Sequence, residues 1–160
     1  MLYLLVTTGK KPDFLQKLIA NALFLSVPES LLEGRGKRTI VSLLKKAHRL
    51  HFSRICIISK REGGASEMSF ISLEEDGSWQ RLSPTIIAQY AVACEEKKAW
   101  RQAQSRSLKL AGTKRAALQQ LLSPLNADSG PVSSITAGAS SLSFKLGKTE
   151  LLKLGVKYEK

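Results

Sequence analysis

The sequence predicts an α/β fold, and three patterns along its 160 residues lead to that prediction. Residues 2–6 are apolar, run into a basic loop, and are followed by apolar residues at helical spacing. A second basic loop precedes another helix-like stretch, which leads into a further strand-like segment. Near the end of the chain, apolar residues alternate on both sides of Gly147-Lys148, which is typical of a β-hairpin.

The first elements are a strand and two helices. Residues 2–6 are apolar on both parities, as in a central strand covered by helices on both faces. Pro12 suits the first turn of a helix that lasts until the break at residues 26–28. Its apolar residues at helical spacing are Phe14, Leu15, Leu18, Ile19, Ala22 and Leu23. Thr39 can cap a second helix. The inward face of that helix consists of Ile40, Leu43, Leu44, Ala47 and Leu50.

Two more strands are predicted before an ambiguous segment. Residues 54–60 and 67–73 have the composition of buried strands, and residues 75–77 supply turn chemistry. Residues 84–95 fit either of two structures, because Ser83-Pro84 is a good helix start while the apolar residues alternate as in a strand. The pattern alone leaves both open.

The second half repeats the order of elements found in the first. Residues 97–106 are polar and basic, which favours a connection between two halves. Residues 107–111 are compatible with a short strand, and Thr113 can cap a helix that runs to Leu122 before the turn cluster at 126–131. Together with the terminal hairpin, strand, helix and hairpin therefore occur twice.

Composition limits the class of protein. The chain has 25 Lys and Arg against 13 Asp and Glu, a net charge of +12, and a pI near 10.0. This charge predicts a polyanionic partner, above all a nucleic acid. Its apolar runs fall short of the roughly 20 residues that cross a bilayer, so we expect a soluble intracellular protein without membrane contact. Cys56 and Cys94 lie in apolar runs, which fits a reducing compartment without disulfide or zinc.

The two basic loops form the predicted RNA-binding site. Lys10 and Lys11 follow the first strand, and Arg35, Lys37 and Arg38 precede the second helix. Loops that leave the carboxyl ends of neighbouring parallel strands gather at one edge, where helix amino termini expose unpaired N–H groups. We expect this edge to hold the phosphates of an RNA.

Other basic and aromatic residues are assigned lesser roles. Lys45, Lys46 and Arg49 point outward from the second helix and are included in the predicted site, although such a stripe is also an ordinary solubilising face. Lys145, Lys153 and Lys157 share the polar parity of the terminal hairpin and are left out of the site. Most aromatic residues, Phe14 among them, occupy apolar positions and are assigned to the core.

Each sequence motif that resembles part of an enzyme site is incomplete. Gly147-Lys148-Thr149 resembles the end of a P-loop, but Leu142 stands where that motif requires glycine. His48 and His51 have no carboxylate pair nearby, and the acidic residues 74–76 cluster in one turn. We therefore predict a protein with no catalytic residues, metal site or cofactor.

Two segments resemble a known family. Leu5-Val6-Thr7-Thr8-Gly9-Lys10 with Pro12, and Arg35-Gly36-Lys37-Arg38-Thr39 before an amphipathic helix, resemble the Brix domain. The similarity covers residues 1 to about 96. Gly9 stands where serine is more common, and the second half matches only in its order of elements.

The resemblance implies a fold and a function. It implies a single Brix domain over residues 1–160, with halves of about 1–96 and 105–160. Each half would resemble the anticodon-binding domain of class II aminoacyl-tRNA synthetases, with a mixed sheet covered by helices, and residues 84–95 would be a strand. It also implies a compact archaeal-type ribosome biogenesis factor that binds ribosomal RNA or its precursor.

Three functions are thus expected, in order of preference. The first is a non-catalytic, cytoplasmic factor for ribosome assembly that binds rRNA by its shape. The alternative is a scaffold that captures a peptide of another ribosome assembly protein on its sheet. A tRNA-binding accessory module is the third, and it rests on fold analogy alone.

Overall fold

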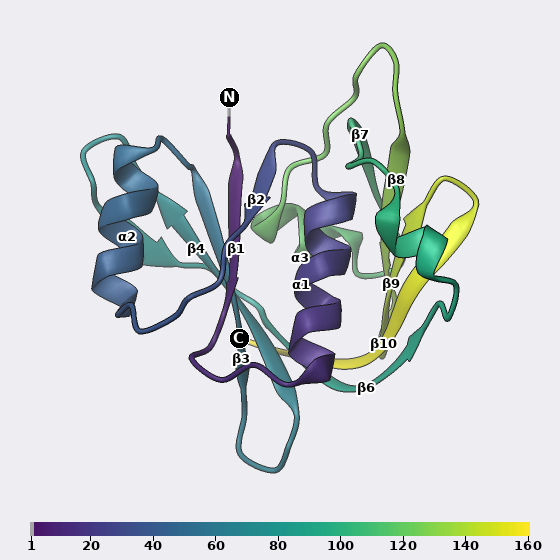
Figure 1. Ribbon diagram of the computed structural model, residues 1–160, viewed down its shortest axis with the longest axis horizontal. Helices are drawn as coiled ribbons and strands as arrows, with labels where there is room; N and C mark the ends of the chain where they lie inside the picture. Colours follow the sequence, from purple (N-terminus) through teal and green to yellow (C-terminus); the bar gives the residue numbers. More distant parts are fainter. Residues whose placement is uncertain (1) are drawn as a thin grey trace.

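The computed structural model describes residues 2–160, which form one continuous curved sheet with three α-helices (Figure 1). The first half contains β1 (Leu4–Thr8), α1 (Phe14–Ser26), β2 (Ser30–Leu32), α2 (Ile40–Arg49), β3 (Arg54–Lys60), β4 (Ser66–Leu73), β5 (Trp79–Arg81) and β6 (Thr85–Ala93). A 3₁₀ helix, η1 (Lys97–Arg101), follows. The second half contains β7 (Ser107–Ala111), α3 (Arg115–Leu121), β8 (Val132–Ala137), β9 (Ser141–Leu146) and β10 (Thr149–Glu159).

The sheet is mixed, as expected. Its strand order is β2-β1-β3-β4-β6-β10-β9-β8-β7, and β5 pairs with β4 off this path. β1 is parallel to both β2 and β3, and β7 is parallel to β8. The remaining neighbours are antiparallel, and the pairing of β6 with β10 joins the two halves into one sheet. The fold class predicted from the sequence, α/β, is confirmed.

Helices cover both faces of the first half, which explains the apolar β1. Leu4 and Val6 belong to a large core around α1, whereas Leu5 lies in a smaller core under α2. All three side chains are fully buried. Burial on both faces removes the alternation that a half-exposed strand would show, and the apolar run of residues 2–6 reflects this.

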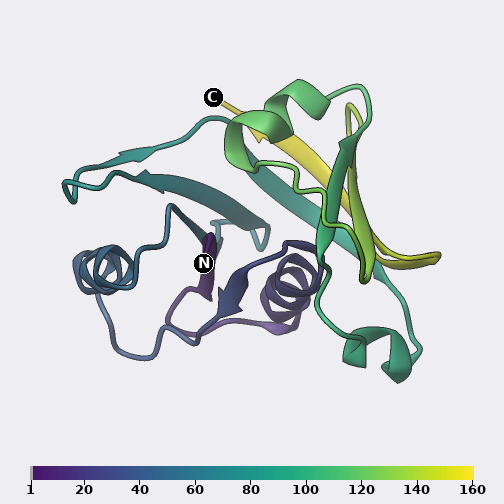
Figure 2. The same ribbon diagram turned by 90° about the horizontal axis from the view of Figure 1, so that it is seen from above.

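Helix α1 lies inside the curve of the sheet, between its two ends (Figure 2). Ile19 and Leu23 of this helix share a core with Phe70 of the first half and Phe144 of the second. Polar contacts join the halves as well. The Ser123 N–H donates to the Tyr3 hydroxyl oxygen at 2.9 Å, and the Ser133 hydroxyl donates to the Ser26 carbonyl.

Individual elements agree with the sequence patterns in some places and differ from them in others. Residues 84–95 contain the strand β6, so the strand interpretation is confirmed over the helix. Helix α1 begins one residue after Asp13, which is its N-cap, and Pro12 lies outside the helix. The predicted Thr113 cap is wrong, because α3 begins after Lys114 and receives no side-chain cap hydrogen bond.

No strand was predicted from the sequence at β2, β5 or β8, and for β2 and β8 the reasons differ. β2 has three residues and is too short to show a period. β8 reads Val-Ser-Ser-Ile-Thr-Ala, and its inward Ser133 breaks the apolar alternation that would mark a strand. Ser133 tolerates burial because its hydroxyl donates to backbone carbonyls, including that of Ser107 at 3.1 Å.

Among residues 2–160, no helix combines the length and apolar character needed to cross a membrane. Cys56 is buried and free, and burial raises the pKa of its thiol. Cys94 is free and partly buried.

Candidate nucleic-acid interface

The two predicted basic loops leave the sheet at the same edge. β1 and β2 are neighbouring parallel strands, with Leu4 opposite Ser30 and Val6 opposite Leu32. Their carboxyl ends therefore point the same way, and the loops that follow them both lie at the lower side of Figure 1. We call residues 9–13 and 33–39 together the carboxyl-edge surface.

The first loop presents two lysines beside a capped helix. The Gly9 N–H donates to the Ile58 carbonyl at 2.9 Å, which extends the sheet before Lys10 and Lys11 turn to solvent. Asp13 closes a capping box on α1, because its carboxylate accepts from the Gln16 N–H at 2.9 Å. This carboxylate occupies the amino terminus of α1, so the lysines are the groups that remain for an external anion.

The second loop is closed by its own hydrogen bonds and exposes its tip. The Arg35 Nε donates to the Arg38 carbonyl at 2.9 Å, and the Arg38 N–H donates to the Arg35 carbonyl at 3.2 Å. Lys37, between them, is exposed. Thr39 caps α2 with a neutral hydroxyl that accepts from the Ser42 N–H at 3.2 Å. The amino terminus of α2 is therefore more favourable for phosphate than that of α1.

An acidic residue that the sequence analysis did not single out neutralises part of this surface. Glu33 accepts a hydrogen bond from the Lys46 ammonium and lies 3.2 Å from the Arg38 guanidinium. The hydrogen bond from Lys46, with a further contribution from Arg38, holds the pKa of Glu33 below its ordinary value despite partial burial. Lys46, expected to face outward, is instead half-buried in this cluster.

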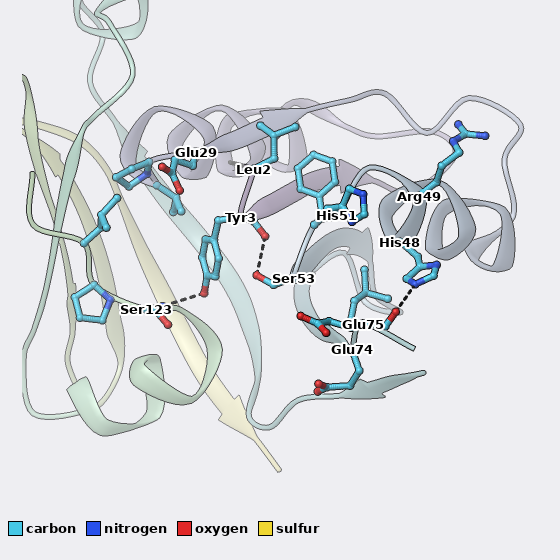
Figure 3. A pocket seen from close by; sticks show the side chains of 16 residues that line it. Leu2, Tyr3, Glu29, His48, Arg49, His51, Ser53, Glu74, Glu75 and Ser123 are labelled. Carbon is cyan, nitrogen blue, oxygen red and sulfur yellow. Dashed lines mark hydrogen bonds between the residues drawn. The ribbon is translucent and has the colours of Figure 1, made fainter. Parts of the chain in front are cut away.

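The remaining predicted residues lie away from the two loops. Lys45 is exposed on the middle of α2. Arg49 lies at the end of α2, and a ten-residue helix is about 15 Å long. Arg49 lines a groove at the opposite edge of the sheet (Figure 3). The structure thus brings together Lys10, Lys11, Arg35, Lys37 and Arg38 at one edge, with Arg38 engaged by Glu33, and separates Arg49 from them.

The carboxyl edge also has an exposed aromatic side chain. Phe14, the first residue of α1, is 76% exposed, although its helical spacing placed it in the predicted core. Val41, the second residue of α2, is 60% exposed. The positions of Phe14 and Val41 in the sequence could have indicated their exposure, because the first turn of a helix that starts at a sheet edge projects beyond the sheet.

The groove at the opposite edge has a different chemistry. Its volume is about 780 Å³, and the first and second halves both line it. Leu2 contributes an apolar side chain to its wall (Figure 3), and Phe52 and Leu125 also line it. His48 Nε2 is held 2.9 Å from the carbonyl oxygen of Glu75 at one end. This groove is a concave apolar surface, unlike the cationic carboxyl edge.

Comparisons with known proteins give two curated relatives and a larger set of similar solved structures. No family model matches the chain. A "Probable Brix domain-containing ribosomal biogenesis protein" of Pyrococcus abyssi is 33% identical over 73 residues, which are 46% of this chain and 33% of that protein. The protein of the same name from Pyrococcus horikoshii is 32% identical over the same lengths. The matched stretch thus spans about a third of the length of these relatives.

One of the similar solved structures extends the likeness to the whole fold. It is described as the crystal structure of a probable ribosomal biogenesis protein from Aeropyrum pernix K1. The TM-score is 0.70 at 16% identity, and the superposition covers 98% of this chain and 96% of that one. The two chains therefore share a fold. The resemblance of this chain to archaeal Brix domain proteins, seen first in its two basic loops, is confirmed by relatives that carry that name.

Proposed function

We propose that this protein is a non-catalytic RNA-binding factor of ribosome biogenesis, which holds ribosomal RNA or its precursor at the carboxyl-edge surface. The observation that carries the proposal is the meeting of two basic loops at one sheet edge, with Lys10, Lys11 and Lys37 exposed. The names of the relatives support the biological setting. Such a role requires binding alone, without metal or cofactor, and we place it in the cytoplasm.

The proposed contacts are to phosphate. Lysine ammonium groups on short loops supply mobile point charges, and Arg35 adds a guanidinium held near the surface by its bond to the Arg38 carbonyl. Contacts of this kind position the protein on the shape of a folded RNA and do not read base edges.

We also propose that the chain is one Brix-type domain built from two related halves. β1, α1 and β2 form a parallel strand–helix–strand unit, and β7, α3 and β8 form another. A hairpin follows each unit, β3–β4 in the first half and β9–β10 in the second. This repeated order supports the two halves of about 1–96 and 105–160, and the proposed likeness of each to an anticodon-binding domain.

Salt dependence tests the proposed binding mode. In filter binding with transcripts that tile the ribosomal RNAs, the plot of log affinity against log salt should have a slope of about −3 to −5, since each neutralised phosphate contributes about −0.7 to −0.9. A slope near zero on every transcript that binds would contradict phosphate contacts.

Replacement of Glu33 by glutamine should strengthen RNA binding. The substitution releases Arg38 and Lys46 from their shared carboxylate. We expect about three- to tenfold tighter binding to the same rRNA fragment and a salt slope steeper by about 1 to 2. We also expect the free energy of unfolding to fall by about 1 kcal/mol, as for a partly exposed ion pair.

The control for this experiment is Glu75→Gln. Glu75 is exposed in the turn beside the opposite groove, so the variant removes one negative charge without releasing a carboxyl-edge cation. Equal gains in affinity for the two variants would show that net charge alone governs binding, and the assignment of Arg38 and Lys46 would be wrong.

The second candidate function, a scaffold for another assembly protein, is favoured by the apolar groove. Its volume of about 780 Å³ and its apolar wall suit a hydrophobic segment of a partner. Charge reversal of Lys10, Lys37 and Arg38 separates the candidates, because RNA binding at the carboxyl edge would be lost while a partner in the groove would be retained.

A further inference from the structure

One face of the second half of the sheet is open to solvent. Helices α1 and α3 lie on the inner side of β8, β9 and β10 (Figure 2), where their side chains share one core with Phe144 and Leu154. The opposite face of these strands carries exposed lysines, Lys145 on β9 and Lys153 and Lys157 on β10. On the adjoining strand β6, this polar face is interrupted by Tyr90 and Val92, each 64% exposed.

The position of Tyr90 is set by a glycine. Tyr90 lies opposite Gly155 in the antiparallel pair of β6 and β10. A Cβ atom added to Gly155 would lie only 2.1 Å from Tyr90 Cε1 and 2.3 Å from Cζ. The phenol ring therefore occupies the space directly over the Gly155 backbone. One side of the ring is supported by the strand, and much of the rest is exposed to solvent.

Cations flank this ring on both sides. Lys153 and Lys157 are two residues before and after Gly155 on the same face of β10, about 6.8 Å away along the strand. Val92 pairs with Lys153, and Ser143 of β9 lies on the other side of that lysine. Among residues 2–160, no carboxylate lies within 4.0 Å of either lysine ammonium. The nearby Glu159 carboxylate is bound instead by Arg61, at 2.9 Å.

We infer that this face binds an unpaired stretch of RNA, with a base stacked on Tyr90 and the adjoining phosphates at Lys153 and Lys157. Proteins that bind single-stranded nucleic acids combine exposed aromatic rings with nearby cations, because every base has a face that stacks on such a ring. On the side away from β10, β6 pairs with β4 only through residues 86–88, but the ring and the two lysines lie on the face of the strands and not along this free edge, so they suit a stacked base and its phosphates better than an added peptide strand. The inference rests on the proposed function for its ligand class, but its site is on different elements from the carboxyl edge.

The test uses the full chain and a twelve-nucleotide oligouridylate that carries 4-thiouridine. Tyr90→Leu keeps Gly155 covered by an apolar side chain but removes the aromatic face, and we expect about tenfold weaker binding. Tyr90→Phe is the matched control and should bind within about twofold of the parent. Gly155→Ala keeps Tyr90 but displaces its ring, so it should weaken binding as Tyr90→Leu does. Circular dichroism and thermal unfolding verify that each variant is folded.

Crosslinking locates the contact. Irradiation and trypsin digestion should give a modified peptide of residues 82–97, the tryptic fragment that contains Tyr90. Unchanged affinity of Tyr90→Leu, or crosslinks confined to other peptides, would overturn the inference. The inference would also be overturned if polyglutamate at an equal concentration displaced the RNA and if Tyr90→Leu weakened the binding of polyglutamate and of RNA equally. That result would favour an acidic protein ligand.

The outcome is separable from that of the proposed function. If the carboxyl edge does not bind RNA, alanine variants of Lys10, Lys11 and Lys37 leave the affinity for folded rRNA fragments unchanged, and the Tyr90 crosslink remains. If instead the Tyr90 face does not bind RNA, those lysine variants still weaken binding to folded fragments, and Tyr90→Leu has no effect on the oligonucleotide.

Discussion

Simultaneous replacement of Lys10, Lys11 and Lys37 by alanine should lower the affinity for a folded rRNA fragment by about 100-fold at moderate salt. The three side chains are exposed on the two loops that meet at the carboxyl edge. A charge-assisted contact at a solvated surface is worth about 1 kcal/mol, and three of them give about two orders of magnitude in affinity. The salt slope should become shallower by about 2 to 3, since fewer counterions are released on binding. Filter binding over a salt series measures both quantities.

A second triple variant separates this site from the effect of overall charge. Replacing Lys97, Lys98 and Lys148 by alanine removes the same number of charges from the total of +12. These lysines are exposed on η1 and on the turn between β9 and β10, away from the carboxyl edge. We expect this variant to lose less than about fivefold in affinity. Equal losses in the two triple variants would indicate binding by diffuse charge and would refute the assignment of a site.

Gly112→Ala should be the most destabilising single substitution that we predict, lowering the free energy of unfolding by about 3 to 5 kcal/mol. Gly112 forms the turn between β7 and α3 with φ of 100°, a backbone conformation that disfavours any side chain. An added Cβ would also lie 2.1 Å from the Ala137 carbonyl oxygen and 2.8 Å from the Ala137 nitrogen, at the end of β8. Because these contacts are with backbone, no rotation of a side chain relieves them. Urea denaturation followed by circular dichroism measures the loss.

Gly147→Ala is the matched variant for the backbone effect alone. Gly147 also has a positive φ, of 62°, but an added Cβ meets nothing within 4 Å. We expect a cost of about 1 to 2 kcal/mol there, from conformational strain without a clash. If Gly112→Ala lowered the free energy of unfolding no more than Gly147→Ala, the β7–α3 turn could not lie as close to the end of β8 as described.

The fold was predictable from the sequence where burial leaves a regular pattern. The apolar β1 reflects its cover by α1 and α2. In β6 the alternation identified a strand but not its buried face, because an irregularity between Ala88 and Tyr90 leaves Ile86 and Ala88 buried and turns Tyr90 and Val92 to solvent. Prediction failed where polar contacts between halves replace apolar packing. Ser133 is buried on β8 because carbonyl groups from α1 and β7 accept its hydroxyl, and those partners are distant in sequence.

The candidate site was predictable in its location but not in its balance of charge. Alternating strands and helices place Lys10 and Arg38 on loops at one edge, whatever the details of the loops. The sequence does not show that Glu33 binds two of the predicted cations, since Lys46 is thirteen residues away. The exposure of Tyr90 could not be predicted either, because Tyr90 has the same parity as the buried Ile86 and Ala88, and the irregularity in β6 that turns it to the opposite face is not visible in the sequence.

Crosslinking of the protein to RNA in cells, followed by sequencing of the bound RNA, shows which RNA the carboxyl-edge surface holds. We predict that reads from ribosomal RNA or its precursor are enriched over those from transfer RNA. We also predict that this enrichment is lost when Lys10, Lys11 and Lys37 are replaced by alanine. Enrichment of transfer RNA, or of ribosomal RNA to the same extent in the triple variant, would contradict the proposal that the carboxyl-edge surface holds ribosomal RNA.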